Sequence, residues 1–192
     1  MAGLIGASVV GVGRDIVNYL TEAAVFFRAT IVVTSGYRSP DGQAQAMLNN
    51  WVKLEHGRVY KPVTLPEVDR AKLDKLFQDL HQASLHAKDK EQAKAEFLKL
   101  AKERVGSKSL HTQGRAIDVA RASITPQLYK AITLSMQEVH EGKRHDIYHF
   151  QSMPTIPQVD AATKEKWQAI QSGSHVPKEH HVFHPPGKFV VC

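Results

Sequence analysis

The sequence predicts an α+β fold in which a small, mainly antiparallel sheet is flanked by helices and interrupted by an inserted helical pair. Short β-branched or alternating segments, typical of strands, occur at 31–34, 116–119 and 146–150. Helical periodicity fills the stretches between them, and one long stretch of helical character covers 66–105. Short strands separated by long helices are typical of the α+β class.

The first part of the chain is predicted to form a helix, a strand and a second helix. Apolar side chains recur at helical spacing over 14–28, and the β-branched run at 31–34 predicts a buried strand. A Ser-Gly pair ends that strand. The Pro-Asp pair that begins 40–54 is typical of the first turn of a helix, and a loop is predicted over 55–65.

The helical pair over 66–105 belongs to an insertion predicted at about 55–106. Its two apolar stripes comprise Leu73, Leu76, Phe77, Leu80, Phe97, Leu100, Ala101 and Val105. Basic and acidic residues are intermixed over 88–104, which is typical of a solvated helix face. We expect the pair to serve as a scaffold. The alternatives are that it covers a cleft, binds a polymer or binds another protein.

The second half is predicted to contain two strands, two helices and a tail. The strand at 116–119 is followed by a helix over 125–142, whose apolar face is Leu128, Ile132, Met136 and Val139. The strand at 146–150 is followed by a last helix over 157–171. From about 172 to 192 the chain is rich in proline and histidine, and we expect a solvated, partly ordered tail.

Length and composition predict one globular domain. The chain has 192 residues, of which 42% are hydrophobic and 23% charged, and this usage argues against a mainly disordered protein. Its single cysteine, Cys192, excludes an intramolecular disulfide framework and a cysteine-rich zinc module. No uncharged apolar run reaches the roughly 18 residues that a membrane-spanning helix needs. We expect a monomer.

The charge favours an anionic partner. The net charge is +6 and the isoelectric point is about 9.4, which suits nucleic acid, an anionic membrane surface or an acidic cell-wall polymer. Nucleic acid is disfavoured, because the basic residues are dispersed, aromatic residues make up only 7%, and no groove-reading motif occurs. Residues 1–13 are apolar but contain no basic segment, so we expect no standard secretory signal.

Candidate metal ligands occur at the ends of two predicted strands. His111 precedes the first of these strands and Asp118 lies within it, with Gly114 allowing a sharp turn between them. Asp146 and His149 flank the second strand. Two histidines and one carboxylate, with one position left for water, are typical of a catalytic zinc site. The metal would lower the pKa of the water toward ~7, and a nearby carboxylate would take its proton.

Each of these residues also has an ordinary interpretation. A histidine and an aspartate at this spacing occur often by chance, and His149 alone is typical of a half-buried histidine. Asp118 is less ordinary, because a carboxylate inside an apolar strand needs a partner or a metal. Spacing alone therefore leaves a metal site as one interpretation among these.

Three segments, in order along the chain, resemble one enzyme family. Residues 109–118 match Ser-x-His-x-x-Gly-x-Ala-x-Asp at all six defining positions. This pattern resembles the zinc D-alanyl-D-alanine peptidase family, which includes VanX-like and VanY-like enzymes and some phage endolysins. Residues 34–39 resemble the Ser-Gly-Tyr-Arg-Ser element of that family, and residues 146–149 resemble its carboxylate-x-x-His element.

The resemblance implies a role for each main residue of the site. His111, Asp118 and His149 would bind one zinc ion. Asp146 would be the general base that takes a proton from the metal-activated water. Arg38 would stabilise the negative charge that develops on the scissile carbonyl, with a structural salt bridge as the alternative.

The resemblance also suggests residues that bind substrate. Ser109, Tyr37 and Gln43 are the candidates. For Ser109 the alternative is a backbone turn or cap, and for Tyr37 we favour packing. Many family members carry glutamate where this chain has Asp146; aspartate is one methylene shorter, so the base would sit differently against the water. The fallback bases are His145, Glu138 and Glu141.

The implied function is zinc-dependent hydrolysis of the peptide stems of peptidoglycan, as a D,D- or L,D-carboxypeptidase or an endopeptidase. Without a standard signal, the enzyme would act at the cell envelope as a lysin released at lysis or as an injected antibacterial effector, and would be cytoplasmic before that. An injected effector would need an immunity protein as partner. The alternative is a zinc-containing module that binds the cell wall or a protein partner without peptidase activity.

Overall fold

The computed structural model describes residues 2–53, 67–81, 86–106, 109–138, 146–152, 156 and 158–174. The chain divides into two compact units. The first comprises Met1–Tyr37 and Gly114–Pro185, and we call it the sheet unit. The second comprises Arg38–Gln113 and Pro186–Cys192, and we call it the helical unit. Among the described residues, every helix is too short or too polar to cross a membrane.

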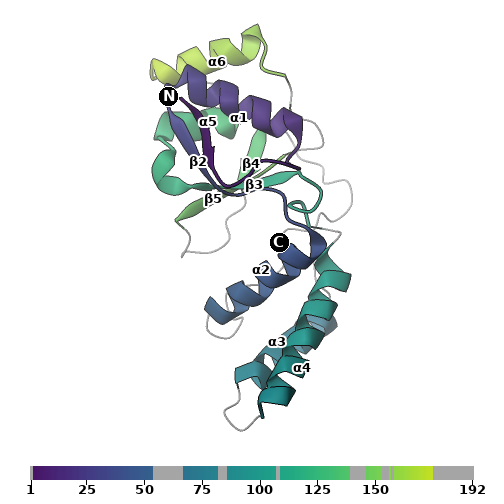
Figure 1. The fold of residues 1–192 in the computed structure, drawn as a ribbon. Coiled ribbons are helices and arrows are strands. Elements are labelled where there is room, and N and C mark those ends of the chain that lie inside the picture. Colours follow the sequence, from purple (N-terminus) through teal and green to yellow (C-terminus); the bar gives the residue numbers. More distant parts are fainter. Residues whose placement is uncertain are drawn as a thin grey trace. The chain divides into compact units, whose positions relative to one another are not determined.

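The sheet unit is built on five strands in the order β1-β2-β3-β5-β4 (Figure 1). The strands are β1 (Gly3–Gly6), β2 (Thr30–Ser35), β3 (Ala116–Ala120), β4 (Met136–Glu138) and β5 (Ile147–Ser152). β1 pairs with β2 in parallel, and the other neighbouring pairs are antiparallel. The predicted α+β class with a mainly antiparallel sheet is therefore confirmed.

Three helices cover one face of this sheet. In Figure 1, α1 (Arg14–Phe26), α5 (Pro126–Ile132) and α6 (Ala161–Gln171) lie together on one side of the strands. Tyr19 and Trp167 join α1 to α6, with ring centroids 5.5 Å apart and both side chains fully buried. The Tyr19 hydroxyl donates a hydrogen bond to the Ala131 carbonyl at 2.7 Å, which ties α1 to α5. The main core therefore lies between the helices and one sheet face.

Alternation along the strands decides which side chains face away from that core. Ile117 and Val119 of β3 and Phe150 of β5 belong to the core under the helices. Because successive strand residues point to opposite faces, Asp118 and His149 lie on the other face of the sheet. Their strands are neighbours, so this face is where a polar site can be assembled.

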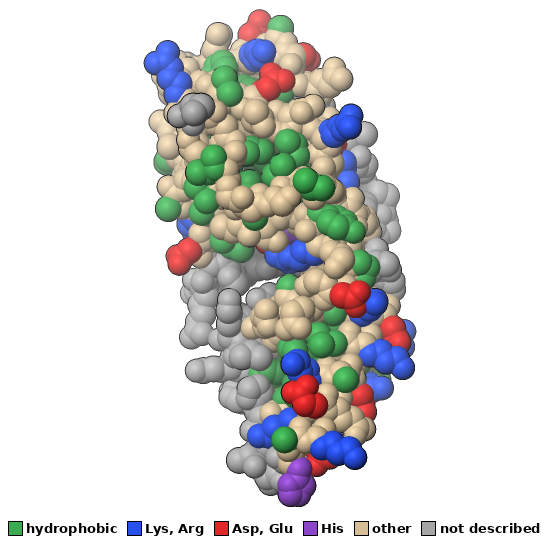
Figure 2. Space-filling model, viewed as in Figure 1, with side chains coloured by type: hydrophobic (Ala, Val, Ile, Leu, Met, Phe, Trp, Pro, Cys, Tyr) green, Lys and Arg blue, Asp and Glu red, His purple; other side chains and the backbone are tan. Residues whose placement is uncertain are grey.

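The helical unit has its own core. It contains α2 (Pro40–Lys53), α3 (Glu67–His81), α4 (Ala87–Ala101) and the π-helical turn η1 (Lys102–Gly106). Its buried residues are Ala44, Met47, Leu48, Leu73, Leu76, Phe77, Phe97, Leu100, Ala101 and Val105. The predicted helical pair is present, and its two apolar stripes meet in this cluster. In Figure 2, acidic and basic side chains are interspersed over this unit, as expected for solvated helix faces.

Three sequence-based element predictions are corrected by the structure. β1 occurs where no strand was predicted. The helix predicted over 125–142 ends at Ile132, and Met136 begins β4 instead. Met136 is buried in β4, and it would also be buried on the apolar face of the predicted helix. Helical spacing alone therefore did not distinguish a continued helix from a strand that follows a turn. The last helix begins at Ala161, after Asp160 caps it by accepting a hydrogen bond from the Thr163 N–H at 2.7 Å.

Some predictions fall outside the described residues. They concern the loop over 55–65, residues 139–142 of the segment predicted as a helix over 125–142, and all but the first three residues of the histidine-rich tail. The predictions of a single domain and of a monomer stay predictions.

Candidate metal centre

Asp118 and His149 face each other across neighbouring strands. The antiparallel register of β3 and β5 pairs Asp118 directly with His149. The Asp118 Oδ1 and His149 Nδ1 atoms are 2.7 Å apart, within hydrogen-bonding distance. Both residues are buried, at 4% and 5% exposure. A buried carboxylate is costly without a partner, and the imidazole supplies one.

A tight turn brings His111 to the same place. The Ser109 hydroxyl oxygen accepts a hydrogen bond from the His111 N–H at 3.3 Å, and the Ser109 carbonyl accepts one from the Thr112 hydroxyl at 2.7 Å. Gly114 then adopts a left-handed backbone with φ of 67°. Its carbonyl accepts a hydrogen bond from the Gly13 N–H at 2.8 Å, which anchors the end of the turn just before β3. The turn reverses the chain between His111 and Asp118.

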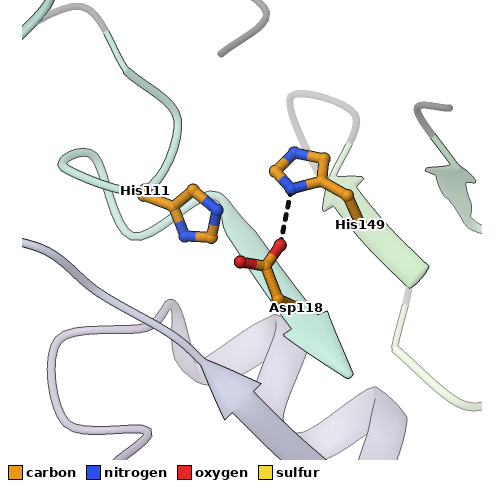
Figure 3. A group of neighbouring side chains, drawn as sticks. All are labelled: His111, Asp118 and His149. Atoms are coloured by element: carbon orange, nitrogen blue, oxygen red, sulfur yellow. Dashed lines mark hydrogen bonds and ion pairs between the residues drawn. The ribbon is translucent and has the colours of Figure 1, made fainter. Parts of the chain in front are cut away.

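His111, Asp118 and His149 form one buried group that could hold a metal ion. The candidate ligand atoms of the three side chains all lie within 4.8 Å of one another. Figure 3 shows both imidazole rings directed toward the Asp118 carboxylate. In tetrahedral coordination, ligand atoms at ~2.0–2.2 Å from one zinc ion lie about 3.3–3.6 Å from one another. Side-chain shifts on the order of 1 Å would therefore let all three bind one ion.

The donor set agrees with the geometry. Two imidazoles and one carboxylate supply two nitrogens and one oxygen, and this set suits a first-row divalent ion such as zinc. Three protein ligands leave a fourth tetrahedral position for water or substrate. The prediction that these three residues converge is confirmed, and they could hold one metal ion.

A bulge in β2 brings another polar residue to this group. The register between β2 and β3 pairs Val33 with Val119 and then Ser35 with Asp118, so Thr34 is the extra residue. Bulges re-aim side chains and occur often beside active sites. Ser35 thus lies opposite the carboxylate of the group. From the sequence, Ser35 is expected to end a strand and to belong to the Ser-Gly-Tyr-Arg-Ser element at 34–39, with no role assigned to its side chain.

Asp146 lies just before β5 and is exposed. Its carbonyl accepts a hydrogen bond from the Arg121 N–H at 2.8 Å, which fixes the backbone three residues before His149. Its carboxylate is not among the three converging ligands. Asp146 is therefore a solvent-exposed carboxylate in the segment that leads into β5, three residues before His149.

Glu138, a fallback base, lies on the opposite face of the sheet. The Tyr129 hydroxyl of α5 donates a short hydrogen bond to its carboxylate. Burial and this neighbouring carboxylate raise the pKa of Tyr129 to about 12, so the phenol stays protonated and keeps donating. Glu138 pairs in register with Phe150 of the core, away from the metal group. The other fallback bases, Glu141 and His145, lie outside the described residues.

Arg38 and Gln43 contact each other in the helical unit. The Arg38 Nη1 donates a hydrogen bond to the Gln43 Oε1 at 3.2 Å, and Gln43 is only 1% exposed. The Arg38 N–H donates to the His111 carbonyl at 3.3 Å, so the backbones of these two residues are adjacent. Gln43 therefore positions the guanidinium. A direct contact of either residue with substrate stays a prediction.

Tyr37 and Ser109 have clear structural contacts. Tyr37 is 45% exposed and packs beside Gly11, where an added Cβ would lie 2.7 Å from the Tyr37 Cγ. Ser109 is fully buried, and its hydroxyl holds the His111 backbone. These contacts agree with a packing role for Tyr37 and with a role of Ser109 in the backbone turn. A role of either side chain in binding substrate stays a prediction.

An ion pair supports the turn that carries His111. The Arg115 Nη1 lies 2.8 Å from the Asp15 Oδ2 and joins the start of β3 to α1. Burial raises the pKa of Asp15, but the hydrogen bond and charge of Arg115, together with backbone N–H donors, outweigh it and lower the pKa below 3.8. Because the pKa of Asp15 is lower in the folded state than in the unfolded state, the carboxylate stabilises the fold at pH values above the unfolded-state pKa. This stabilisation is lost as the pH falls through the folded-state pKa.

We predict that the Asp15→Asn variant loses this pH-dependent stability. At pH 7 its free energy of unfolding should be lower than that of the wild type by less than about 1 kcal/mol, because the pair is partly exposed. The difference should shrink below about pH 4, where the wild-type carboxylate becomes protonated. Urea denaturation at pH 7 and at a pH below about 4 measures this difference in the free energy of unfolding. A difference that grows in acid would contradict the assignment.

Comparisons with protein-family models, with curated proteins and with solved structures find no match. The family resemblance therefore depends on the residues of the three segments alone.

Proposed function

We propose that this protein is a zinc-dependent peptidase that hydrolyses peptide bonds in the stem peptides of peptidoglycan. The observation that carries the proposal is the buried group of His111, Asp118 and His149 with three donors for one ion. Three protein ligands of this kind are the usual number in catalytic zinc sites, whereas structural zinc sites are filled by four. Zinc bound there would polarise the scissile carbonyl and make water more acidic.

The chain's own residues would prepare this site before substrate arrives. Without metal, Asp118 holds the His149 ring through the contact at 2.7 Å, which zinc would replace by coordination, and Ser109 fixes the backbone of His111. Fixed ligand orientation is what a catalytic metal site needs, because small displacements weaken metal binding and activity. The two strands and the turn supply this rigidity.

Asp146 would act as the general base. It is an exposed carboxylate placed three residues before His149 by a backbone that Arg121 anchors. An exposed carboxylate can take a proton from a water molecule and release it to the solvent or to the leaving amine. Because Asp146 is outside the three-ligand group, removing its charge would leave the ligands in place.

Arg38 would stabilise the negative charge on the scissile carbonyl oxygen. Its N–H is bonded to the His111 carbonyl, and its guanidinium is held by the buried Gln43. A guanidinium fixed in advance stabilises developing charge without having to reorganise during the reaction. Gln43 would then be a positioning residue.

The substrate class is supported by charge and by the family resemblance. A net charge of +6 favours association with an anionic cell wall. The segments at 34–39, 109–118 and 146–149 resemble a family that cuts peptidoglycan stems. In this proposal the enzyme acts at the cell envelope as a lysin or as an injected effector, and an injected effector would be held inactive in its producer by an immunity protein.

We predict that the zinc-loaded protein changes the masses of muropeptides from purified sacculi. The expected product is a stem that has lost a residue or has been split, and a chelator should prevent its formation. The Asp146→Asn variant should retain zinc and lose at least about 100-fold in rate, because a general base contributes 10²–10⁴-fold. Mass spectrometry of the digest measures both effects.

The control is Glu165→Gln, which neutralises an exposed carboxylate on α6 and should leave the rate unchanged. Unchanged cleavage by Asp146→Asn would show that another group is the base. If sacculi bind the zinc-loaded protein but yield no product, the peptidase proposal is wrong. The alternative, a zinc-containing module that binds wall or a partner, would then be favoured.

A further inference from the structure

Gln151 is a buried polar residue beside the metal group. It follows His149 by two positions in β5, so both side chains lie on the same face of the sheet, about 7 Å apart along the strand. Gln151 is only 6% exposed. Its partner in register on β3 is Ala116, whose methyl group offers no hydrogen bond.

The amide of Gln151 is only partly satisfied. Its Nε2 donates a hydrogen bond to the Gln137 Oε1 of β4 at 2.9 Å. Its Oε1 is buried and has no hydrogen-bond partner among the described residues. If the oxygen and nitrogen positions of both amides are exchanged, the Gln137 nitrogen donates to the Gln151 oxygen. The Gln151 nitrogen is then the buried atom without a partner. Either way, one buried polar atom of Gln151 lacks a partner.

An unsatisfied buried amide destabilises a folded protein by more than a hydrogen bond usually contributes. Such groups are rare in native structures, and they are explained by a water, an ion or a functional role. Gln151 lies two positions from His149 on the same face of β5, so a molecule bound at the metal group that displaces what covers the amide could supply the missing partner. The adjacent residues Asp118 and His149 already contact each other at 2.7 Å.

We propose that Gln151 is a substrate-recognition residue whose Oε1 accepts a hydrogen bond from a backbone N–H of the bound peptide. This inference depends on the proposed peptidase function for the identity of the ligand. An extended peptide has nearly the same repeat as a β-strand. With its scissile carbonyl at the metal group, such a peptide would present a backbone N–H about two residues away to Gln151.

The test combines Gln151→Met with N-methylated peptides. Methionine has similar length but no amide, and methylating one peptide nitrogen at a time removes one N–H donor at a time. Binding of a synthetic stem pentapeptide is measured by calorimetry on the zinc-loaded full chain that carries Asp146→Asn, so the peptide stays intact. One methylation should weaken binding about three- to tenfold when Gln151 is present, and much less in Gln151→Met.

Two further variants make the result specific. Gln168→Met makes the same change at an exposed position of α6 and should bind every peptide as the parent does. Gln151→Asn retains an amide but withdraws it by one methylene, so the same methylation effect should be lost. The Asn variant keeps the inference testable if the methionine variant fails to fold.

Stability provides an independent readout. Because Gln151→Met removes an unsatisfied buried amide, its urea midpoint should equal or exceed that of the wild type. A glutamine that serves only the fold would give a lower midpoint and unchanged peptide binding, and that result would overturn the inference.

Hydrolysis of sacculi by the wild type separates the two proposals. Cleavage without any coupling between Gln151 and a peptide N–H would leave the peptidase standing and overturn the role of Gln151. Coupling without cleavage would overturn the peptidase, while Gln151 would stand as a peptide-binding residue.

Discussion

Replacing Gly114 by alanine should destabilise the protein by at least about 3 kcal/mol. Gly114 has a φ of 67°, and an added Cβ would lie 2.2 Å from the carbonyl oxygen of Gly11. The left-handed backbone alone costs about 1–2 kcal/mol for a residue with a Cβ. The clash is with backbone, which cannot rotate away, so the Gly13–Gly114 hydrogen bond at 2.8 Å would break. Chemical denaturation measures the loss.

Gly173→Ala is the matched control for this prediction. Gly173 also has a positive φ, 75°, but an added Cβ would meet nothing within 4 Å. Only the backbone term applies there, so the expected loss is about 1–2 kcal/mol. Equal losses in the two variants would show that the close approach of Gly11 to Gly114 is unimportant. Because Gly114 ends the turn that carries His111, its variant should also bind zinc less tightly.

Replacing Asp118 by asparagine should weaken zinc binding by at least about 100-fold. The change keeps the size of the side chain but removes the charged oxygen ligand. Loss of a residue that merely supports a ligand already costs 10–100-fold in metal affinity, so loss of a ligand should cost more. Competition with a chromophoric chelator measures the affinity. Zinc at about 100 times its Kd should stabilise the wild type by about 2.7 kcal/mol, and the variant far less.

Asp146→Asn is the control for zinc binding. It makes the same chemical change at an exposed carboxylate near His149, and it should retain wild-type affinity for zinc. The histidine-rich tail is the same in all these proteins, so a difference between them reports on the buried group. Equal zinc affinity in Asp118→Asn and the wild type would contradict the assignment of the ligands.

Elements with strong local signals could be predicted from the sequence. The Pro-Asp pair predicted the start of α2, which begins at Pro40. Thr125 and Pro126 predicted the start of α5, and the Thr125 hydroxyl does accept a hydrogen bond from the Leu128 N–H. In both cases the signal is a contact between residues a few positions apart, so the tertiary structure was not needed.

Elements that depend on distant partners were missed. β1 is a short glycine-containing strand that exists because it pairs in parallel with β2. β4 has three residues, and Met136 continues the helical spacing of the residues before it. Propensity over three or four residues is too weak to define a strand. Pairing with β5 and burial of Met136 under the helices decide the outcome.

A metal group around the segment from His111 to Asp118 could be predicted from the sequence alone. These residues are close along the chain, Gly114 permits the turn between them, and an aspartate in an apolar strand needs a partner. The tertiary structure decided what completes the group. His149 meets Asp118 only because β3 and β5 pair in one register, and a shift by one residue would turn His149 to the other face. The separate register of β4 against β5 pairs Glu138 with Phe150 of the core and so places it away from this group. Strand pairing of this kind is set by contacts between distant residues.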